Sequence, residues 1–350
     1  MQLGIIGKPL VGKTTIFELL SEQRGSVNIS GQTNQAMAKV PDERIDYLSE
    51  IYQPKKTAYA QLELIDIPGL SPDSEKSSRV FLDQVRKADA LLLVIKLFKD
   101  EFDSDLTPLA DIENISYELL LSDLDLLERR IERINSNKKK NKMLSELHLL
   151  ERLQTALEKE QPLSSVELNA EEQEIMKTYQ FLTNKPLLVC LNLDESYLSD
   201  GDYPEKNEIK AYADDHDLAI VELSAGIELE IAELEQQEKN DFYRDLGIAE
   251  PGLIRIIQGI YRRLGLISFF TVGEDEVKAW TIPAGMVAKL AAGKIHSDIE
   301  RGFIRAEVVA YDDLRQAGNM NTVKEQGKFR LEGKEYIVED GDIVHFRFNV

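Results

Sequence analysis

The sequence has very little cysteine and is poor in basic residues relative to acidic ones. Cys190 is the only cysteine among 350 residues, which excludes an internal disulfide framework, and its apolar neighbours predict a small core side chain. Lysine and arginine together number 42 against 63 aspartates and glutamates. The resulting net charge of −21 argues against bulk attraction to nucleic acid or anionic membrane, so any RNA contact must use a local basic patch.

Long apolar runs are also missing. The longest candidates, ALLLVI and PLLVCL, are much shorter than the roughly 18 residues of a membrane span. Gln2 opens a predicted strand without the basic segment of a signal peptide, so we expect a cytoplasmic protein with no membrane partner. The composition, 43% hydrophobic and 30% charged, is that of a globular protein, and a chain of 350 residues suggests two or three domains.

The most informative stretch is the N-terminal one, MQLGIIGKPLVGKTTIFELL. A short buried strand precedes Gly7-x-x-x-x-Gly12-Lys13-Thr14, the phosphate-loop pattern, and a helix follows it. The glycines allow backbone N–H groups to turn around the α- and β-phosphates, while Lys13 can reach the β/γ-phosphate oxygens and the Thr14 hydroxyl can ligate Mg²⁺. The nucleotide-binding residues predicted here are Gly7, Leu10, Val11, Gly12, Lys13, Thr14 and Thr15.

A second motif follows a later predicted strand. The segment AYAQLELIDIPGL alternates like a strand and ends in DIPG, where Asp66 can hold the metal through water and Gly69 can offer its N–H to the γ-phosphate. Leu70 occupies the position at which many GTPases carry a water-orienting Gln, so hydrolysis must draw on another group or on the backbone. The expected catalytic residues are Lys13, Thr14, Asp66 and Gly69.

The polar segment between these motifs occupies the position of a first nucleotide-sensing loop. In such a loop a hydroxyl meets Mg²⁺ beside the γ-phosphate. Ser30 and Thr33 are the candidates, and ordinary solvated hydroxyls are the alternative. We expect Mg²⁺ as the cofactor, with Thr14, Asp66 and Thr33 as the metal-binding residues.

Base recognition is expected after two further strands. The strand KPLLVCL leads into NLDE, residues 192–195, which corresponds to the guanine-reading pattern Asn-Lys-x-Asp. Leu193 replaces the Lys and Glu195 replaces the Asp that accepts two hydrogen bonds from guanine, so specificity should lean to ATP. After the strand AIVEL, a backbone N–H of residues 224–225 is expected to face the base. The predicted base-side residues are Asn192, Leu193, Glu195, Ser224 and Ala225.

The middle and the end of the chain have different patterns. Between Asp111 and Leu182, two runs with helical spacing flank a polar segment, which predicts an antiparallel helical hairpin with a basic tip from Lys138 to Lys142. These lysines form either a solvated turn or a docking point for RNA. The cations from Lys289 to Arg305 allow the same two interpretations, an RNA patch or a mixed-charge surface. Near the C-terminus, IVEDGDIVHFRFNV predicts a hairpin turning at 340–342.

Several segments resemble one family. From Leu264 onward the sequence resembles the TGS domain of YchF-type, Obg-like ATPases, and VPDERIDYL, DIPGL and LSAGIELEIAELE resemble the same family further upstream. The resemblance implies an α/β P-loop NTPase domain with a mostly parallel sheet, an inserted helical hairpin arm and a C-terminal β-grasp, ubiquitin-like TGS domain. The expected boundaries are 1–112 with 183–265 for the nucleotide domain, 113–182 for the arm and 266–350 for the TGS domain.

The resemblance also implies a function, and three departures bear on it. The family implies ATP hydrolysis, with ATP preferred over GTP, and association with the ribosome through the TGS domain and the arm tip. NISGQTNQAMAKV lacks the family's Tyr-Pro-Phe-x-Thr-Ile type segment, SPDSEKSSRVFL lacks glycine, and residues 98–109 lack the histidine proposed as catalytic in some members. A slow regulatory ATPase, a nucleotide-gated RNA- or ribosome-binding protein with little hydrolysis, and a GTP-specific GTPase all remain open.

Overall fold

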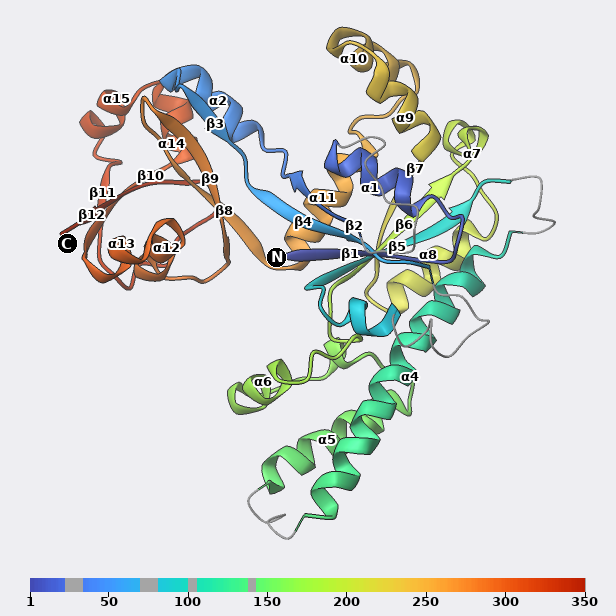
Figure 1. Ribbon diagram of the computed structural model, residues 1–350. Helices are drawn as coiled ribbons and strands as arrows, with labels where there is room; N and C mark the ends of the chain where they lie inside the picture. Colours follow the sequence, from blue (N-terminus) through green and yellow to red (C-terminus); the bar gives the residue numbers. More distant parts are fainter. Residues whose placement is uncertain (23–33, 70–80, 100–105, 138–142, 350) are drawn as a thin grey trace. The chain divides into compact units, whose positions relative to one another are not determined.

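The computed structural model describes residues 1–22, 34–69, 81–99, 106–137 and 143–349 (Figure 1). Contacts divide the chain into two compact units. The first unit comprises Met1–Met37 and Glu63–Ile256, and the second comprises Ala38–Leu62 and Ile257–Val350. The second unit therefore contains a segment, 38–62, that the expected boundaries place in the nucleotide domain.

The first unit is built on a six-stranded sheet with the strand order β2-β4-β1-β5-β6-β7. Its strands are β1 (Gln2–Ile6), β2 (Asn34–Lys39), β4 (Gln61–Asp66), β5 (Ala90–Leu97), β6 (Leu187–Leu193) and β7 (Ala219–Leu223). Strand β1 pairs in parallel with β4 and β5, and β6 pairs in parallel with β5 and β7. The predicted, mostly parallel sheet is confirmed. Since the parallel strands end at the same edge, the loops after β1, β4, β6 and β7 gather there.

Helices lie between these strands and after the last of them, β7. They are α1 (Lys13–Ser21), α4 (Pro108–Asn135), α5 (Leu144–Leu157), the 3-10 helix η2 (Leu163–Ser165), α6 (Ala170–Lys177), α7 (Glu195–Asp200), α8 (Lys206–Asp215), α9 (Ala225–Glu233), α10 (Gln236–Asp245) and α11 (Gly252–Arg263). Helix α11 continues across the boundary between the two units. Over the described part of the chain, no helix has both the length and the apolar composition needed to cross a membrane.

The predicted helical arm is present, and one long helix joins it to the sheet. The first turns of α4 pack in the core of the nucleotide domain through Ile112, Ile115 and Leu119. From Leu120 onward the same helix packs in a second core with α5 and α6 (Figure 1). The apolar core of the arm thus begins inside α4 and not at residue 113, where the sequence placed the boundary.

A buried carboxylate fixes the base of the arm. The Asp123 side chain on α4 is fully buried and accepts hydrogen bonds from the backbone N–H of Leu182 (3.0 Å) and of Thr183 (2.8 Å). The guanidinium of Arg86 approaches the same carboxylate to 3.3 Å. Burial raises the pKa of Asp123, and these donors oppose the rise. Asp123 therefore ties the middle of α4 to the chain that returns into β6.

The second unit contains the β-rich C-terminal domain. Its sheet has the order β11-β10-β12-β8-β9-β3. The strands are β3 (Lys56–Ala58), β8 (Leu266–Thr271), β9 (Glu276–Pro283), β10 (Phe303–Ala310), β11 (Arg330–Glu332) and β12 (Asp342–Phe348), and the helices are α2 (Glu43–Tyr52), α12 (Ala288–Ile295), α13 (Ser297–Arg301), α14 (Tyr311–Ala317) and α15 (Met320–Glu325). Strands β8 and β12 pair in parallel, and the alanines of α12 pack with Phe269 and Phe346 on one face. The expected β-grasp arrangement is confirmed.

The segment 38–62 completes this second sheet. Strand β3 pairs in parallel with β9, and α2 packs against β9. The Arg44 guanidinium of α2 binds the Asp340 carboxylate at 2.8 Å and lies 5.2 Å from the centre of the Phe270 ring. Ile45 and Leu48 on the same helix are fully buried. Helix α2 and strand β3 therefore belong structurally with the C-terminal sheet, although the chain returns from them directly to β4.

The predicted hairpin at 340–342 is wrong. The turn exists, since Gly341 has φ 90°, but residues 333–340, which lie directly before it, form no strand. Ile337 forms an isolated bridge with Val287, and β12 pairs with β10 and β8. The Asp340 carboxylate accepts the N–H of Ser268 at 2.8 Å, so the turn is held by β8 and not by a neighbouring hairpin strand.

Candidate functional site

The loop after β1 has the backbone that the phosphate-loop pattern demands. Gly7 has φ 148° and Gly12 has φ 94°, in the region that side chains rarely adopt. A Cβ on Gly7 would come within 2.5 Å of the Val94 carbonyl oxygen, so glycine is also required by space. Leu10 is mostly exposed and Thr15 is half-buried. The loop leads into α1, whose first N–H groups have no carbonyl partner within the helix and suit an anion.

The amine of Lys13 lies inside this loop. Its side chain is 7% exposed, and Nζ donates to the carbonyl oxygens of Gly7 (3.2 Å) and Lys8 (2.5 Å). Burial lowers the pKa of Lys13 to about 8, while the charge of Asp66 opposes the shift. A phosphate group is a better partner than two carbonyls for this poorly solvated cation, so the position fits the predicted role.

Two metal-binding candidates, Thr14 at the start of α1 and Asp66 at the end of β4, meet beside Lys13. The Thr14 hydroxyl donates to Asp66 Oδ2 at 3.1 Å, across the end of β4. Burial raises the pKa of Asp66, and the hydrogen bond from Thr14 and the charge of Lys13 oppose the rise. Hydroxyl and carboxylate oxygens are the donors that Mg²⁺ prefers, so the residues present fit a Mg²⁺-nucleotide that Thr14 and Asp66 would hold. The described residues contain no group of three or more His, Cys, Asp or Glu side chains arranged to hold a metal.

Gly69 lies against the phosphate loop. A Cβ at this position would come within 2.9 Å of the Pro9 nitrogen and 3.1 Å of Lys13 Nζ, so only glycine permits this approach. The structure thus brings together the four residues expected to be catalytic, Lys13, Thr14, Asp66 and Gly69. Ser30, Thr33 and Leu70 lie outside the described residues, so their predicted roles stay predictions.

Asn192 has a role that the sequence pattern did not reveal. Its Nδ2 donates to the carbonyl oxygen of Val11 at 3.0 Å, and its Oδ1 accepts the N–H of Ala225 at 2.9 Å. The side chain is buried and joins the phosphate loop to the loop after β7. The Ala225 N–H, expected to face the base, is therefore engaged by Asn192. The sequence did hold one signal for this role, since Asn192 lies at the end of a predicted strand, at the edge of the sheet where the phosphate loop also lies.

The other base-side candidates differ in exposure. Leu193 is a core residue, 2% exposed, and Ser224 is buried with its hydroxyl oxygen accepting the N–H of Ile227 at the start of α9. Glu195 is exposed at the start of α7, after the Asp194 side chain that caps this helix. Among these base-side candidates, Glu195 is thus the one that is exposed.

The burial of Lys13 predicts a pH dependence for nucleotide binding. With a pKa of about 8, the amine loses its charge as the pH rises through 8 in the free protein, whereas bound phosphate favours the charged form. Affinity should therefore fall above pH 8, with proton uptake on binding. Calorimetry at pH 8.5 in two buffers of different ionisation enthalpy measures this uptake, and K13R, which stays charged, should abolish it. Equal affinities at pH 7 and 9 would contradict the assignment.

The C-terminal cations do not gather on one face. Lys289 and Lys294 lie on α12, which covers the side of the sheet that holds Ala306. Because neighbouring residues of a strand point to opposite faces, Arg305 lies on the other side of β10. Arg301 pairs with Asp298 on α13. The stretch from Lys289 to Arg305 is therefore not a single patch, and the basic tip of the arm lies outside the described residues.

Comparisons with known proteins agree with this arrangement. A family model described as a 50S ribosome-binding GTPase matches residues 2–129, and YchF-GTPase_C, described as a protein of unknown function (DUF933), matches 266–349. The Ribosome-binding ATPase YchF of Bacillus subtilis is 42% identical, and that of Haemophilus ducreyi is 41% identical, each with 99% of both chains covered. The Schizosaccharomyces pombe YchF GTPase structure matches with a TM-score of 0.89 and 31% identity, covering 99% of this chain and 97% of that one. The chain belongs to the YchF family of P-loop nucleotide-hydrolysing proteins.

Proposed function

We propose that this protein hydrolyses ATP slowly with Mg²⁺ and acts as a nucleotide-dependent regulatory switch on the ribosome, in the cytoplasm. The observation that carries the proposal is the convergence of Lys13, Thr14, Asp66 and Gly69 on one phosphate loop. Relatives of 42% and 41% identity named as ribosome-binding ATPases support the ribosomal part. The nucleotide domain would carry out the chemistry, and the arm and the TGS domain would contact the ribosome.

Each residue of the loop has a separate task in this proposal. The loop N–H groups and the Lys13 ammonium would bind the phosphates and neutralise charge that develops during transfer. Thr14 and Asp66 would hold Mg²⁺, which would supply positive charge against the phosphates. The Gly69 N–H would orient the γ-phosphate. Since Leu70 follows in place of a glutamine, no side chain at this position can orient water, which accounts for slow turnover.

Leu70 also favours a second candidate function. A nucleotide-gated ribosome-binding protein needs phosphate and metal contacts but no group that activates water. Single-turnover hydrolysis of ATP, with and without purified ribosomes, separates the two functions. A rate that rises above the rate of the Lys13→Ala variant supports the ATPase. Nucleotide-dependent ribosome binding without hydrolysis would instead support the gated binding protein.

Base selection gives a further prediction. We propose that Glu195 disfavours guanine because its carboxylate extends further than the aspartate of the guanine-reading pattern. E195D should improve GTP affinity relative to ATP by about tenfold, the factor that corresponds to 1.4 kcal/mol. Competition titration measures the ratio, and E195Q, which keeps the length without the charge, is the control. A wild-type preference for GTP would contradict the base-reading argument. Leu193 is left unchanged because its buried position would force a lysine amine into the core.

A further inference from the structure

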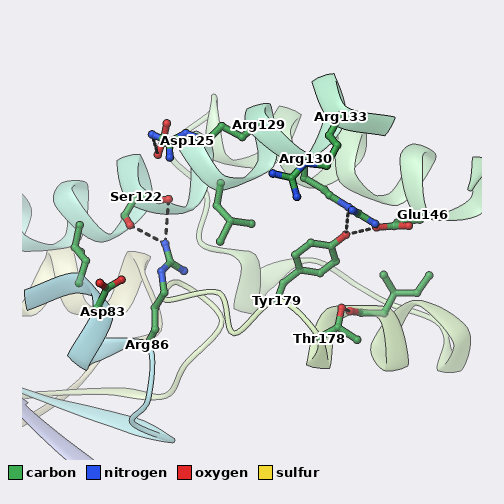
Figure 2. A pocket seen from close by; sticks show the side chains of 13 residues that line it. Asp83, Arg86, Ser122, Asp125, Arg129, Arg130, Arg133, Glu146, Thr178 and Tyr179 are labelled. Carbon is green, nitrogen blue, oxygen red and sulfur yellow. Dashed lines mark hydrogen bonds and ion pairs between the residues drawn. The ribbon is translucent and has the colours of Figure 1, made fainter. Parts of the chain in front are cut away.

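An open groove runs along the helical arm, away from the phosphate loop. It has a volume of about 1140 Å³, and its walls come from residues 82–86, from one side of α4 and from α5 and α6 (Figure 2). Its charged lining residues are Asp83, Arg86, Asp125, Arg129, Arg130, Arg133 and Glu146. Four arginines in one groove are unexpected in a chain with a net charge of −21.

Two of these arginines are structural. Arg86 donates to the Ser122 hydroxyl at 2.8 Å and to the Ser122 carbonyl at 3.2 Å, beside its contact with Asp123. Arg130 binds Glu146 at 2.7 Å and donates to the Tyr179 hydroxyl at 3.1 Å, which joins α4, α5 and the end of α6 (Figure 2). Both guanidinium groups are neutralised by carboxylates of the protein, so their task is to hold the walls of the groove in place.

The other two arginines have weaker ties to the protein. Arg129 is 71% exposed and pairs with Asp125, one turn away on the same helix and itself 55% exposed. Such an exposed pair is worth only about 0.3–0.5 kcal/mol, so a stronger anion can replace it. For Arg133 no hydrogen bond or ion pair is found within the described part of the chain, and its side chain is exposed. The two residues are spaced i, i+4 and so lie on one side of α4.

Local charge favours an anionic partner at this end of the groove. Residues 129–137 contain three basic residues and one acidic residue, Glu132, although the whole chain is strongly acidic. The acidic residue Asp83 lies at the other end, beside Arg86 (Figure 2). Arginine binds phosphate through two parallel hydrogen bonds, and an open groove leaves room for an extended chain of phosphates.

We propose that Arg129 and Arg133 form an RNA-backbone contact on the arm, separate from the nucleotide site, with Arg86 and Arg130 shaping the groove that receives the strand. The inference rests on the proposed ribosome binding and assigns part of that binding to the middle of α4. Contacts of this kind go to phosphate and are independent of base sequence. They also make binding strongly dependent on salt, because each neutralised phosphate releases counterions.

The test is the double variant R129Q/R133Q in the full chain. We measure co-sedimentation with purified ribosomes, and binding to protein-free ribosomal RNA, over a series of salt concentrations. Loss of two phosphate contacts should flatten the slope of log K against log salt by about 1.5 and weaken binding at low salt by tenfold or more. ATP hydrolysis without ribosomes and the urea midpoint of unfolding should not change, since both side chains are exposed and distant from the phosphate loop.

The matched control variant removes the same number of positive charges from residues outside the groove. Arg152 and Arg244 are exposed arginines in single ion pairs outside the groove, so R152Q/R244Q should retain the wild-type slope. The inference is overturned if R129Q/R133Q keeps the wild-type salt slope, or if it loses no more affinity than the control variant. Either result leaves the proposed ribosome binding of the protein unaffected. A loss with ribosomes but not with free RNA assigns the contact to a ribosomal protein and overturns RNA as the partner. Failure of the unmodified protein to bind ribosomes overturns the proposed function and this inference together.

Discussion

Replacing Lys13 with alanine is expected to weaken ATP binding by about 10- to 100-fold and to remove measurable hydrolysis. The amine lies inside the phosphate loop, and hydrogen bonds to charged groups are worth about 1.5–3 kcal/mol each. Folding should survive the change, because the hydrogen bonds of Nζ to the carbonyl oxygens of Gly7 and Lys8 lie within the phosphate loop itself. Burial already lowers the pKa of this lysine to about 8, so the folded protein gains little from its charge without nucleotide. Calorimetry with Mg²⁺ and ATP measures the loss.

The phosphate loop supplies its own control for this prediction. Lys8 lies in the same loop, but its amine pairs with Asp111 and its side chain is 46% exposed. K8A removes the same charge from nearly the same place, so a purely long-range effect would weaken ATP binding equally in both variants. We expect K8A to change the affinity less than threefold. An unchanged ATP affinity and hydrolysis rate in K13A would remove Lys13 from the site.

The sequence signals for the candidate site are local, and the structure places Lys13, Thr14, Asp66 and Gly69 close together. The spacing from Gly7 to Thr14 indicates a phosphate loop, whose conformation depends on the glycines within the motif itself. The structure places this loop between β1 and α1. Asp66 and Gly69 could be assigned to the same predicted site, because parallel strands end at one edge of the sheet. The apolar runs at β5 and β6 are typical of strands that are buried on both faces of a parallel sheet.

Interactions between distant parts of the chain were harder to predict. The pairing of β3 with β9 joins Thr57 to Val277, and no local pattern reports such a partner. The buried position of Asp123 did leave a signal, since it lies four residues from both Leu119 and Leu127 in the apolar repeat of α4. A charged residue at a core position implies buried partners, but the sequence does not say that Arg86 and Thr183 supply them.

The segment 38–62 gives the last prediction, which concerns folding. A fragment of residues 257–350 should be largely unfolded, whereas the same fragment joined to 38–62 by a flexible linker should fold. Ile45 and Leu48 are fully buried, and losing each costs about 1.5–3 kcal/mol. Without β3, the edge of β9 also loses its backbone partner, and Phe270 loses the Arg44 guanidinium. These losses are large against the about 5–15 kcal/mol that stabilise a whole domain.

Circular dichroism and urea unfolding compare the two fragments, and a third fragment serves as the control. The joined fragment with I45D/L48D keeps the length and the linker but cannot bury α2, so it should behave like 257–350 alone. If 257–350 alone unfolds cooperatively with the midpoint of the joined fragment, the C-terminal domain is independent of the segment. The expected result would instead mean that the C-terminal domain is completed by a helix and a strand, α2 and β3, that come from the chain between β2 and β4.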